Sequence, residues 1–224
     1  SRSAYYSVLL ALPLLLVYEV LIIFTKSKYW VIRNAADVWI RTFLKAFDIN
    51  AQHLTFVMIG ISLAFIPFAK IRSPGVKIKI KYFLIMLMES FVYSIILGTL
   101  LQFILKLGGL SNIGFSNSLL QNVALSIGAG LFEEIIFRVV LLNLLFFIIH
   151  PFIKKTVLKV IFSVLISSLL FSISHYVGSL ADSWEIYSFM FRWIAGILFA
   201  VLYFIRGFGI TAYTHTLYDI WVLV

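Results

Sequence analysis

Three short patterns of ionisable residues lie inside strongly apolar stretches of the sequence. An ionised side chain at the centre of a bilayer costs about 2.5 to 3.5 kcal/mol on insertion scales, so such residues indicate function. Carboxylates and imidazoles are also the groups that most often act as general bases in hydrolysis. The three patterns comprise Glu133, Glu134 and Arg138, then Phe171 and His175, and finally His215 and Asp219.

The first pattern places two adjacent acids before an arginine. Glu134 and Arg138 are four residues apart with the acid first, which is the favoured order for an ion pair on one face of a helix. Glu133 is then expected to point elsewhere, because adjacent helical residues are about 100° apart. We therefore expect Glu134 to be a structural acid and Glu133 a working acid. The alternative is that both acids neutralise Arg138 and hold helices together.

The other two patterns each contain one histidine. His175 closes an apolar stretch just before a polar loop, where a lone histidine is more often an interfacial residue than a catalyst. His215 and Asp219 are four residues apart, so the carboxylate can orient the imidazole or share a ligand with it. A structural hydrogen bond between helices is the alternative for this pair. Taken together, the three patterns are poorly explained by helix packing alone, because the polar residues of each pattern can serve as partners for those of the others.

The order of these patterns resembles that of a known protease family. EExxxR, then FxxxH, then HxxxN or HxxxD on successive membrane helices is typical of the CAAX-protease and bacteriocin-processing (CPBP) intramembrane proteases, which include the Rce1-type prenyl-protein endopeptidases. The resemblance covers residues 118–224. It implies that Glu133 and His175 activate the attacking water, and that His215 and Asp219 stabilise the oxyanion.

Asp219 departs from the family pattern, which often has asparagine at this position. An ionised aspartate cannot donate a hydrogen bond to an oxyanion. We therefore expect Asp219 to orient His215, which is left as the donor.

A zinc ion is the main alternative to a mechanism based on glutamate alone. The sequence has no cysteine and no HExxH motif, so a metal would need a ligand set of nitrogen and oxygen. That set would be Glu133, His175, His215 and Asp219. The metal-free mechanism is preferred, and no cofactor is expected.

The elements that position these residues are predicted to be membrane helices. Of the 224 residues, 62% are hydrophobic and 12% are charged, against about 25% charged residues in a soluble domain. Spanning about 30 Å of hydrocarbon takes roughly 20 helical residues, and this length divides the chain into about seven segments. We predict an all-α fold, a polytopic transmembrane helix bundle that forms a single domain, residues 1–224. The predicted spans are residues 4–24, 53–69, 82–105, 118–149, 157–175, 186–205 and 208–224.

Two segments do not fit a simple span. Residues 25–52 carry apolar residues at helical spacing among charged ones, which predicts an amphipathic helix lying in the membrane interface. Residues 118–149 are too many for one straight span, so this segment is expected to tilt, protrude or kink. Gly128 and Gly130 offer a flexible place just before the two acids.

The remaining charges are expected to serve the membrane and the packing of the bundle. The net charge of +9 comes from 18 basic and nine acidic residues, and the basic residues gather between apolar segments, where lipid headgroups attract them. Nucleic acid is therefore not an expected partner. Glu19 and Glu89 are expected to pair with Arg192 or with backbone groups. The basic clusters are residues 26–33, 70–81 and 154–159.

Together these features predict an intramembrane endopeptidase. Its expected partners are membrane lipid and a membrane-anchored or exported substrate, cut in a prenylated C-terminal tail or a sorting signal. The expected setting is the cytoplasmic membrane of a prokaryote, which the chain crosses several times. The alternatives are a non-catalytic scaffold or immunity protein and a proton-coupled transporter. Transporters often contain inverted repeats, and no repeat is evident here.

Overall fold

The computed structural model describes residues 3–25, 33–49, 53–107, 119–178 and 181–223, and within them it contains helices and turns but no strand. Residues 26–32, 50–52, 118 and 224, which belong to predicted segments, lie outside the described residues. In chain order the helices are α1 (Ala4–Phe24), α2 (Ala35–Lys45), α3 (Leu54–Ile71), α4 (Ile80–Leu107), α5 (Leu119–Gly128), η1 (Ala129–Glu133), η2 (Ile135–Leu142), α6 (Asn143–Ile149), α7 (Thr156–Ser174), α8 (Ile186–Arg206) and α9 (Phe208–Leu223).

The all-α prediction is confirmed, and each of the seven predicted spans corresponds to a helix or a run of helices. Four helices in the described part, α1, α4, α7 and α8, are long and apolar enough to cross a membrane, and a fifth apolar helix in α3 is shorter. Large apolar side chains point away from the bundle, among them Phe56 of α3 and Met88 of α4, which are 73% and 71% exposed. Such a surface is stable in lipid and not in water, so the chain is an integral membrane protein.

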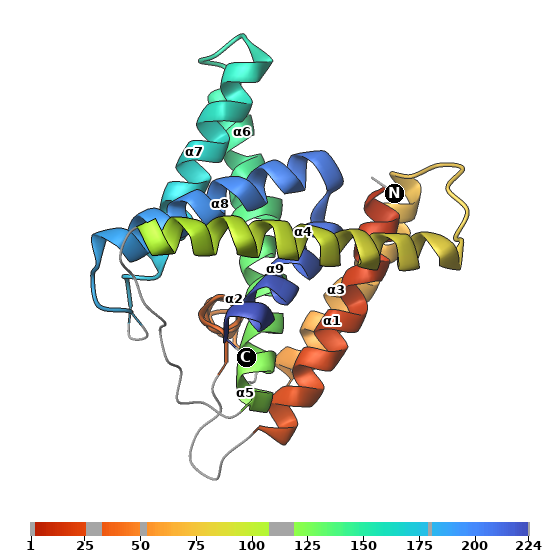
Figure 1. The fold of residues 1–224 in the computed structure, drawn as a ribbon. Coiled ribbons are helices and arrows are strands. Elements are labelled where there is room, and N and C mark those ends of the chain that lie inside the picture. Colours follow the sequence, from red (N-terminus) through yellow and green to blue (C-terminus); the bar gives the residue numbers. More distant parts are fainter. Residues whose placement is uncertain (1–2, 26–32, 50–52, 108–118, 179–180, 224) are drawn as a thin grey trace.

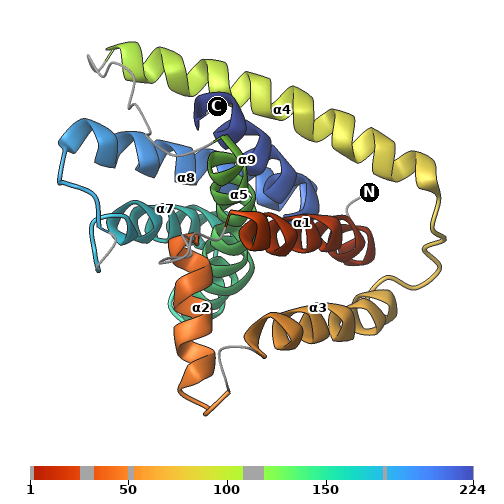
Figure 2. The ribbon, with the colours of Figure 1, turned by 90° about the horizontal axis from the view of Figure 1, so that it is seen from below.

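Helices α4 and α8 run across other helices of the bundle (Figure 1). Figure 1 shows α4 and α8 running across the continuous rod that α5, η1, η2 and α6 form. Figure 2 shows α3 and α4 on opposite sides of the bundle, with α1, α5 and α9 between them. Helix α9 packs against α1, α4, α5, η1 and α8. The C-terminal helix therefore occupies the centre, and its side chains can reach several elements at once.

The rod is the predicted long segment, and it is widened rather than kinked. Two π-helical stretches, η1 and η2, meet at Glu134, which has ordinary helical dihedral angles. A π-helical turn contains more residues than an α-helical one and is frequent at functional sites.

The glycines just before this point allow close packing instead of bending. A Cβ on Gly130 would lie 2.1 Å from Thr216 Oγ1 and 2.5 Å from the Ala212 carbonyl oxygen of α9. A Cβ on Gly128 would lie 2.8 Å from Asn34 Cβ. The prediction that these glycines provide a flexible place is therefore replaced by a packing role on two sides of the rod.

Helix α2 lies in the segment for which an amphipathic helix is predicted, but two of its charged side chains face the protein. Asp37 is fully buried and Arg41 is 8% exposed, whereas Phe43 is 65% exposed. Asn34 caps its first turn, since its side chain accepts the Ala36 N–H at 2.9 Å. The buried charges dock α2 onto α1, Ile40 and Leu44 pack against the core, and Trp39 and Phe43 remain available for lipid.

The predicted partners of Glu19 and Glu89 are wrong. Glu19 pairs with Arg33 at 3.2 Å and also with Arg41. Glu89 of α4 accepts a hydrogen bond from Arg206, at the end of α8, at 2.6 Å. Arg192 instead pairs with Asp182, at 2.6 Å.

Candidate active site

Helix α9 brings His215 against the two acids of the rod. The Nδ1 atom of His215 lies 2.7 Å from Glu134 Oε1, and its Nε2 atom lies 4.0 Å from Glu133 Oε2. Both acids therefore reach the same ring, although their spacing predicts that Glu133 points elsewhere. The contact depends on Gly130, because the backbone of α9 occupies the space that a side chain there would need.

The geometry fixes which nitrogen of His215 is available for chemistry. A carboxylate oxygen accepts hydrogen bonds, so Nδ1 carries the proton that bonds to Glu134. Nε2 faces the other two acids, at 3.6 Å from Asp219 Oδ2 and 4.0 Å from Glu133 Oε2. The ring stacks on Phe199 of α8, with centroids 4.4 Å apart and planes 18° apart. Carboxylates on the ring edge and an aromatic face thus hold the imidazole.

Sequence reasoning gives the orienting role to Asp219, whereas in the structure Glu134 makes the hydrogen bond to His215. Asp219 faces the opposite nitrogen at an ion-pair distance, 3.6 Å, which is too long for a hydrogen bond. Glu134 also forms the ion pair with Arg138 that their spacing predicts, at 3.0 Å. One buried acid therefore joins the first motif to the third.

Phe171 connects the second motif to this cluster. The Arg138 guanidinium lies 4.7 Å from the centroid of the Phe171 ring, in a cation–π arrangement. The same ring contacts both histidines edge-on, with centroid distances of 5.0 Å to His175 and 6.4 Å to His215. Phe171 is buried, so it supports both imidazoles as a rigid apolar surface.

His175 lies at the end of α7, where its two ring nitrogens have different roles. Its Nδ1 atom lies 3.0 Å from the Phe171 carbonyl oxygen, which can only accept, so Nδ1 carries the proton and Nε2 is left with a lone pair. The following loop is tied to it, because Asp182 N donates to the His175 carbonyl at 2.9 Å. The His175 imidazole is close enough to Glu133 for an electrostatic interaction. The histidine of the second motif thus lies within electrostatic range of Glu133 in the first motif.

Asn34 is a neighbour of Glu133 that sequence reasoning missed. Its Nδ2 atom donates a hydrogen bond to Glu133 Oε1 at 2.9 Å, across 99 residues of sequence. An asparagine just before Ala35-Ala36-Asp37 is a recognisable helix-cap signal, which could have located the start of α2. Nothing in the sequence connects that cap to Glu133.

The predicted zinc set was tested against the same geometry. Among the residues that the structure describes, no three histidine or carboxylate side chains converge closely enough to hold a metal ion. The Nδ1 atoms of His215 and His175 are engaged by Glu134 and by a carbonyl, which leaves Nε2 of each ring for another ligand. The described residues thus contain no preformed metal site.

Comparison with known families places these residues in one region. Residues 115–221 match the family model described as Type II CAAX prenyl endopeptidase Rce1-like. The C-terminal part of the chain is Rce1-like. This match confirms the resemblance drawn from the motifs, for the part of the chain that it covers. No curated protein and no solved structure matches the chain.

The Rce1-like region contains every residue of the three motifs and leaves α1 to α4 before it. Asn34 therefore lies outside the part of the chain that the family model describes. The Rce1-like region thus supplies the residues of the three motifs, and the N-terminal part of the chain adds the Asn34 side-chain amide that bonds to Glu133.

Proposed function

We propose that this protein is an intramembrane endopeptidase in which Glu133 and the two histidines hydrolyse a peptide bond in a membrane-associated substrate. The observation that carries the proposal is the gathering of all three motifs around His215, whose ring lies between Glu134 at one nitrogen and Glu133 and Asp219 at the other. Packing needs no such concentration of acids around one imidazole, whereas activation of a water needs a positioned general base within hydrogen-bond reach.

The attacking water is activated by Glu133 together with His175. Glu133 Oε1 is bonded to Asn34, so Oε2 is the oxygen that can take a proton. His175 offers the lone pair of Nε2 as a second acceptor. Water oxygen bonds to the scissile carbonyl carbon as its proton passes to Glu133. The C–N bond then breaks and the same proton moves to the leaving amine, which gives a new carboxylate and a new amine.

His215 stabilises the negative charge that develops on the carbonyl oxygen. Its Nδ1–H is committed to Glu134, so Nε2 is the atom that donates to the oxyanion. Donors fixed in advance at such a position typically contribute about 10²- to 10³-fold in kcat. Asp219, 3.6 Å from Nε2, favours a proton on that nitrogen. This role for Asp219 requires a carboxylate and not the amide that the family often has.

The proposed substrate is a C-terminal tail that approaches through the bilayer, either prenylated or carrying a sorting signal. The family description, CAAX prenyl endopeptidase, supports the prenylated tail. The apolar outward surface of the helices suits a chain that crosses the membrane several times and meets lipid and a lipid-anchored substrate. A prokaryotic cytoplasmic membrane is the setting that we propose, with no nucleic acid partner.

The test is cleavage of defined peptides by detergent-solubilised protein, followed by mass spectrometry. The peptides are a farnesylated peptide ending in a CAAX tail, the same peptide without the lipid, and an exported sorting signal. We expect wild type to cut the farnesylated peptide and the Glu133→Ala and His175→Ala variants to cut none of the three. Equal cleavage by wild type and both variants would refute the assigned site.

Two further arms separate the alternative mechanisms and functions. Activity that survives a chelator supports the glutamate mechanism, while loss that zinc restores supports the metal alternative. An absence of cleavage in all three peptides would favour the scaffold or transporter interpretation.

A further inference from the structure

Asn34 connects the N-terminal helices to the proposed general base. It is the residue before α2, and its side chain makes two polar contacts, to the Ala36 N–H and to Glu133 Oε1, both at 2.9 Å. Glu133 is 8% exposed, so a hydrogen bond to its carboxylate is made away from bulk water, where it is stronger than in water.

The two contacts settle which end of the Asn34 amide faces Glu133. A backbone N–H can only donate, so the atom that accepts it is the amide oxygen. The amide nitrogen is then left for the carboxylate, which accepts when it is ionised. The interaction is therefore a charge-assisted hydrogen bond from Asn34 Nδ2 to Glu133 Oε1.

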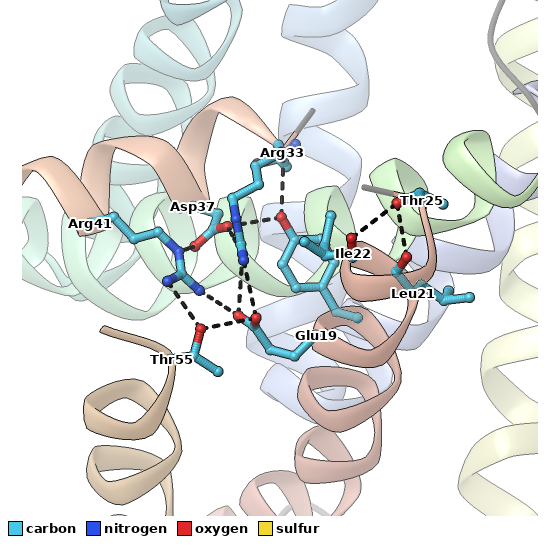
Figure 3. A network of polar contacts seen from close by, with 10 residues as sticks. Glu19, Leu21, Ile22, Thr25, Arg33, Asp37, Arg41 and Thr55 are labelled. Carbon is cyan, nitrogen blue, oxygen red and sulfur yellow. Dashed lines mark hydrogen bonds and ion pairs between the residues drawn. The ribbon is translucent and has the colours of Figure 1, made fainter. Parts of the chain in front are cut away.

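A buried network holds the Asn34 backbone in place. The Asn34 N–H donates to the Tyr18 hydroxyl at 3.3 Å, and that hydroxyl donates to Asp37 Oδ2 at 2.9 Å. The preceding residue, Arg33, bonds to Glu19 and Asp37. Figure 3 shows Glu19, Arg33 and Asp37 between α1 and α2, with the guanidinium of Arg33 directed at Glu19. The bonds of Arg33 before it and Asp37 after it, together with its own N–H, thus hold Asn34 in place.

The rod is shaped to receive Asn34 close to its axis. A Cβ at Gly128 would lie 2.8 Å from Asn34 Cβ and 2.7 Å from Tyr18 Cε2, closer than real Cβ atoms approach. Gly128 is five residues before Glu133, a little over one turn along the rod. The absence of a side chain here lets Asn34 pack beside the working acid.

We propose that Asn34 is a positioning residue that fixes the rotation of the Glu133 carboxylate by holding Oε1, so that Oε2 faces His215 and the water to be activated. This inference rests on the proposed function. Helix capping alone would not need the amide nitrogen, because aspartate and serine cap helices as well as asparagine does.

The test uses variants that keep the cap and remove the donor. Asn34→Asp retains the acceptor for Ala36 but places a second carboxylate beside Glu133, and Asn34→Ser retains a cap without the charge or the reach. We expect kcat for the farnesylated CAAX peptide to fall about 10- to 100-fold in both variants, as for small misplacements of catalytic groups. KM is expected to stay close to that of wild type in both variants, and the melting temperature in detergent is expected to stay close to that of wild type in Asn34→Ser, which adds no charge.

The control is Ser3→Ala, which removes the cap of α1, where Ser3 Oγ accepts the Tyr5 N–H, away from the site. Its kcat is expected to equal that of wild type. A wild-type kcat in either Asn34 variant would overturn the positioning role while leaving the proposed function intact. Failure of wild type itself to cut the peptide would overturn the proposed function, and with it the role of Asn34.

Discussion

Two buried charge clusters in the described part of the chain differ in how completely their acids are paired. In the α1–α2 network of Figure 3, two acids, Glu19 and Asp37, face two arginines, Arg33 and Arg41, and each acid contacts both. The pKa of Arg33 lies above its ordinary value, because its hydrogen bonds to Glu19 and Asp37 outweigh the lowering effect of burial. This network is saturated and neutral.

The cluster around His215 is not saturated. Of its three acids, Glu133, Glu134 and Asp219, Glu134 pairs with Arg138, and all three lie within 4.0 Å of the imidazole of His215. Glu134 Oε2 has no hydrogen-bond partner among the described residues. Acids that are neutralised by arginines hold helices together and are poor proton acceptors. An excess of acids around one imidazole instead leaves carboxylate oxygens that can accept a proton. We infer that the first cluster serves stability and the second serves catalysis.

The largest effect is expected from Glu133→Gln. The substitution keeps the size of the side chain and an oxygen for Asn34, but an amide cannot take a proton from water. We expect kcat to fall by about 10²- to 10⁴-fold, as for other general bases, with an unchanged melting temperature. Peptide cleavage followed by mass spectrometry measures the first, and thermal unfolding in detergent measures the second.

The matched control for this substitution is Glu89→Gln. Glu89 is also a membrane-helix acid, but it pairs with Arg206 between α4 and the end of α8. Its kcat is expected to equal that of wild type. Similar losses of kcat in Glu89→Gln and Glu133→Gln would remove the contrast between an acid paired with its own arginine and the acids around His215.

His215→Ala is expected to have the next largest effect. The variant loses the proposed oxyanion donor and the stack on Phe199, so kcat should fall by about 10²- to 10³-fold. KM should change little, because the oxyanion forms only in the transition state. Steady-state kinetics with the farnesylated peptide separate the two parameters. A rise in KM at constant kcat would instead mean that His215 binds the substrate in its ground state.

Gly130→Ala tests whether activity and stability depend on the close approach of α9 to the rod. A methyl group at Gly130 would overlap Thr216 Oγ1 and the Ala212 carbonyl, so α9 must shift and carry His215 away from Glu133. We expect a loss of about 1 to 3 kcal/mol in stability from overpacking and a loss of about 100-fold in kcat for a displacement near 1 Å. Thermal unfolding and peptide cleavage measure the two effects.

Gly60→Ala is the matched control, because a Cβ at Gly60 meets nothing within 4 Å. Alanine there is expected to leave activity unchanged and to raise helix stability by about 0.5 to 1 kcal/mol. If Gly130→Ala behaves like Gly60→Ala, the helix contact does not set the geometry of the site.

The sequence predicted the helices better than the partners of their polar residues. The segments 4–24 and 208–224 correspond closely to Ala4–Phe24 and Phe208–Leu223, because apolar length is a local property that the bilayer thickness fixes. The pairing of Glu19 with Arg33 could not be predicted in this way, since it depends on how α2 folds back onto α1.

In the candidate site, too, the sequence predicts contacts within one helix but not contacts between helices. Spacing on one helix predicts the Glu134–Arg138 pair, because four residues make about one turn. It does not predict that Glu134 also reaches His215, 81 residues away, nor that Asn34 completes the environment of Glu133. Such contacts depend on the π-helical widening of the rod and on the packing of α9, neither of which leaves a periodic pattern in the sequence.

Glu19→Gln tests the saturated cluster and is expected to have the smallest effect on turnover. The substitution leaves Arg33 and Arg41 with Asp37 as their remaining acid, and breaking a buried pair typically costs about 3 to 5 kcal/mol. We expect a lower melting temperature in detergent, together with a fall of kcat smaller than that of Asn34→Asp. A fall of kcat as large as that of Glu133→Gln, with unchanged stability, would mean that the α1–α2 network belongs to the catalytic site and that saturation does not distinguish the two clusters.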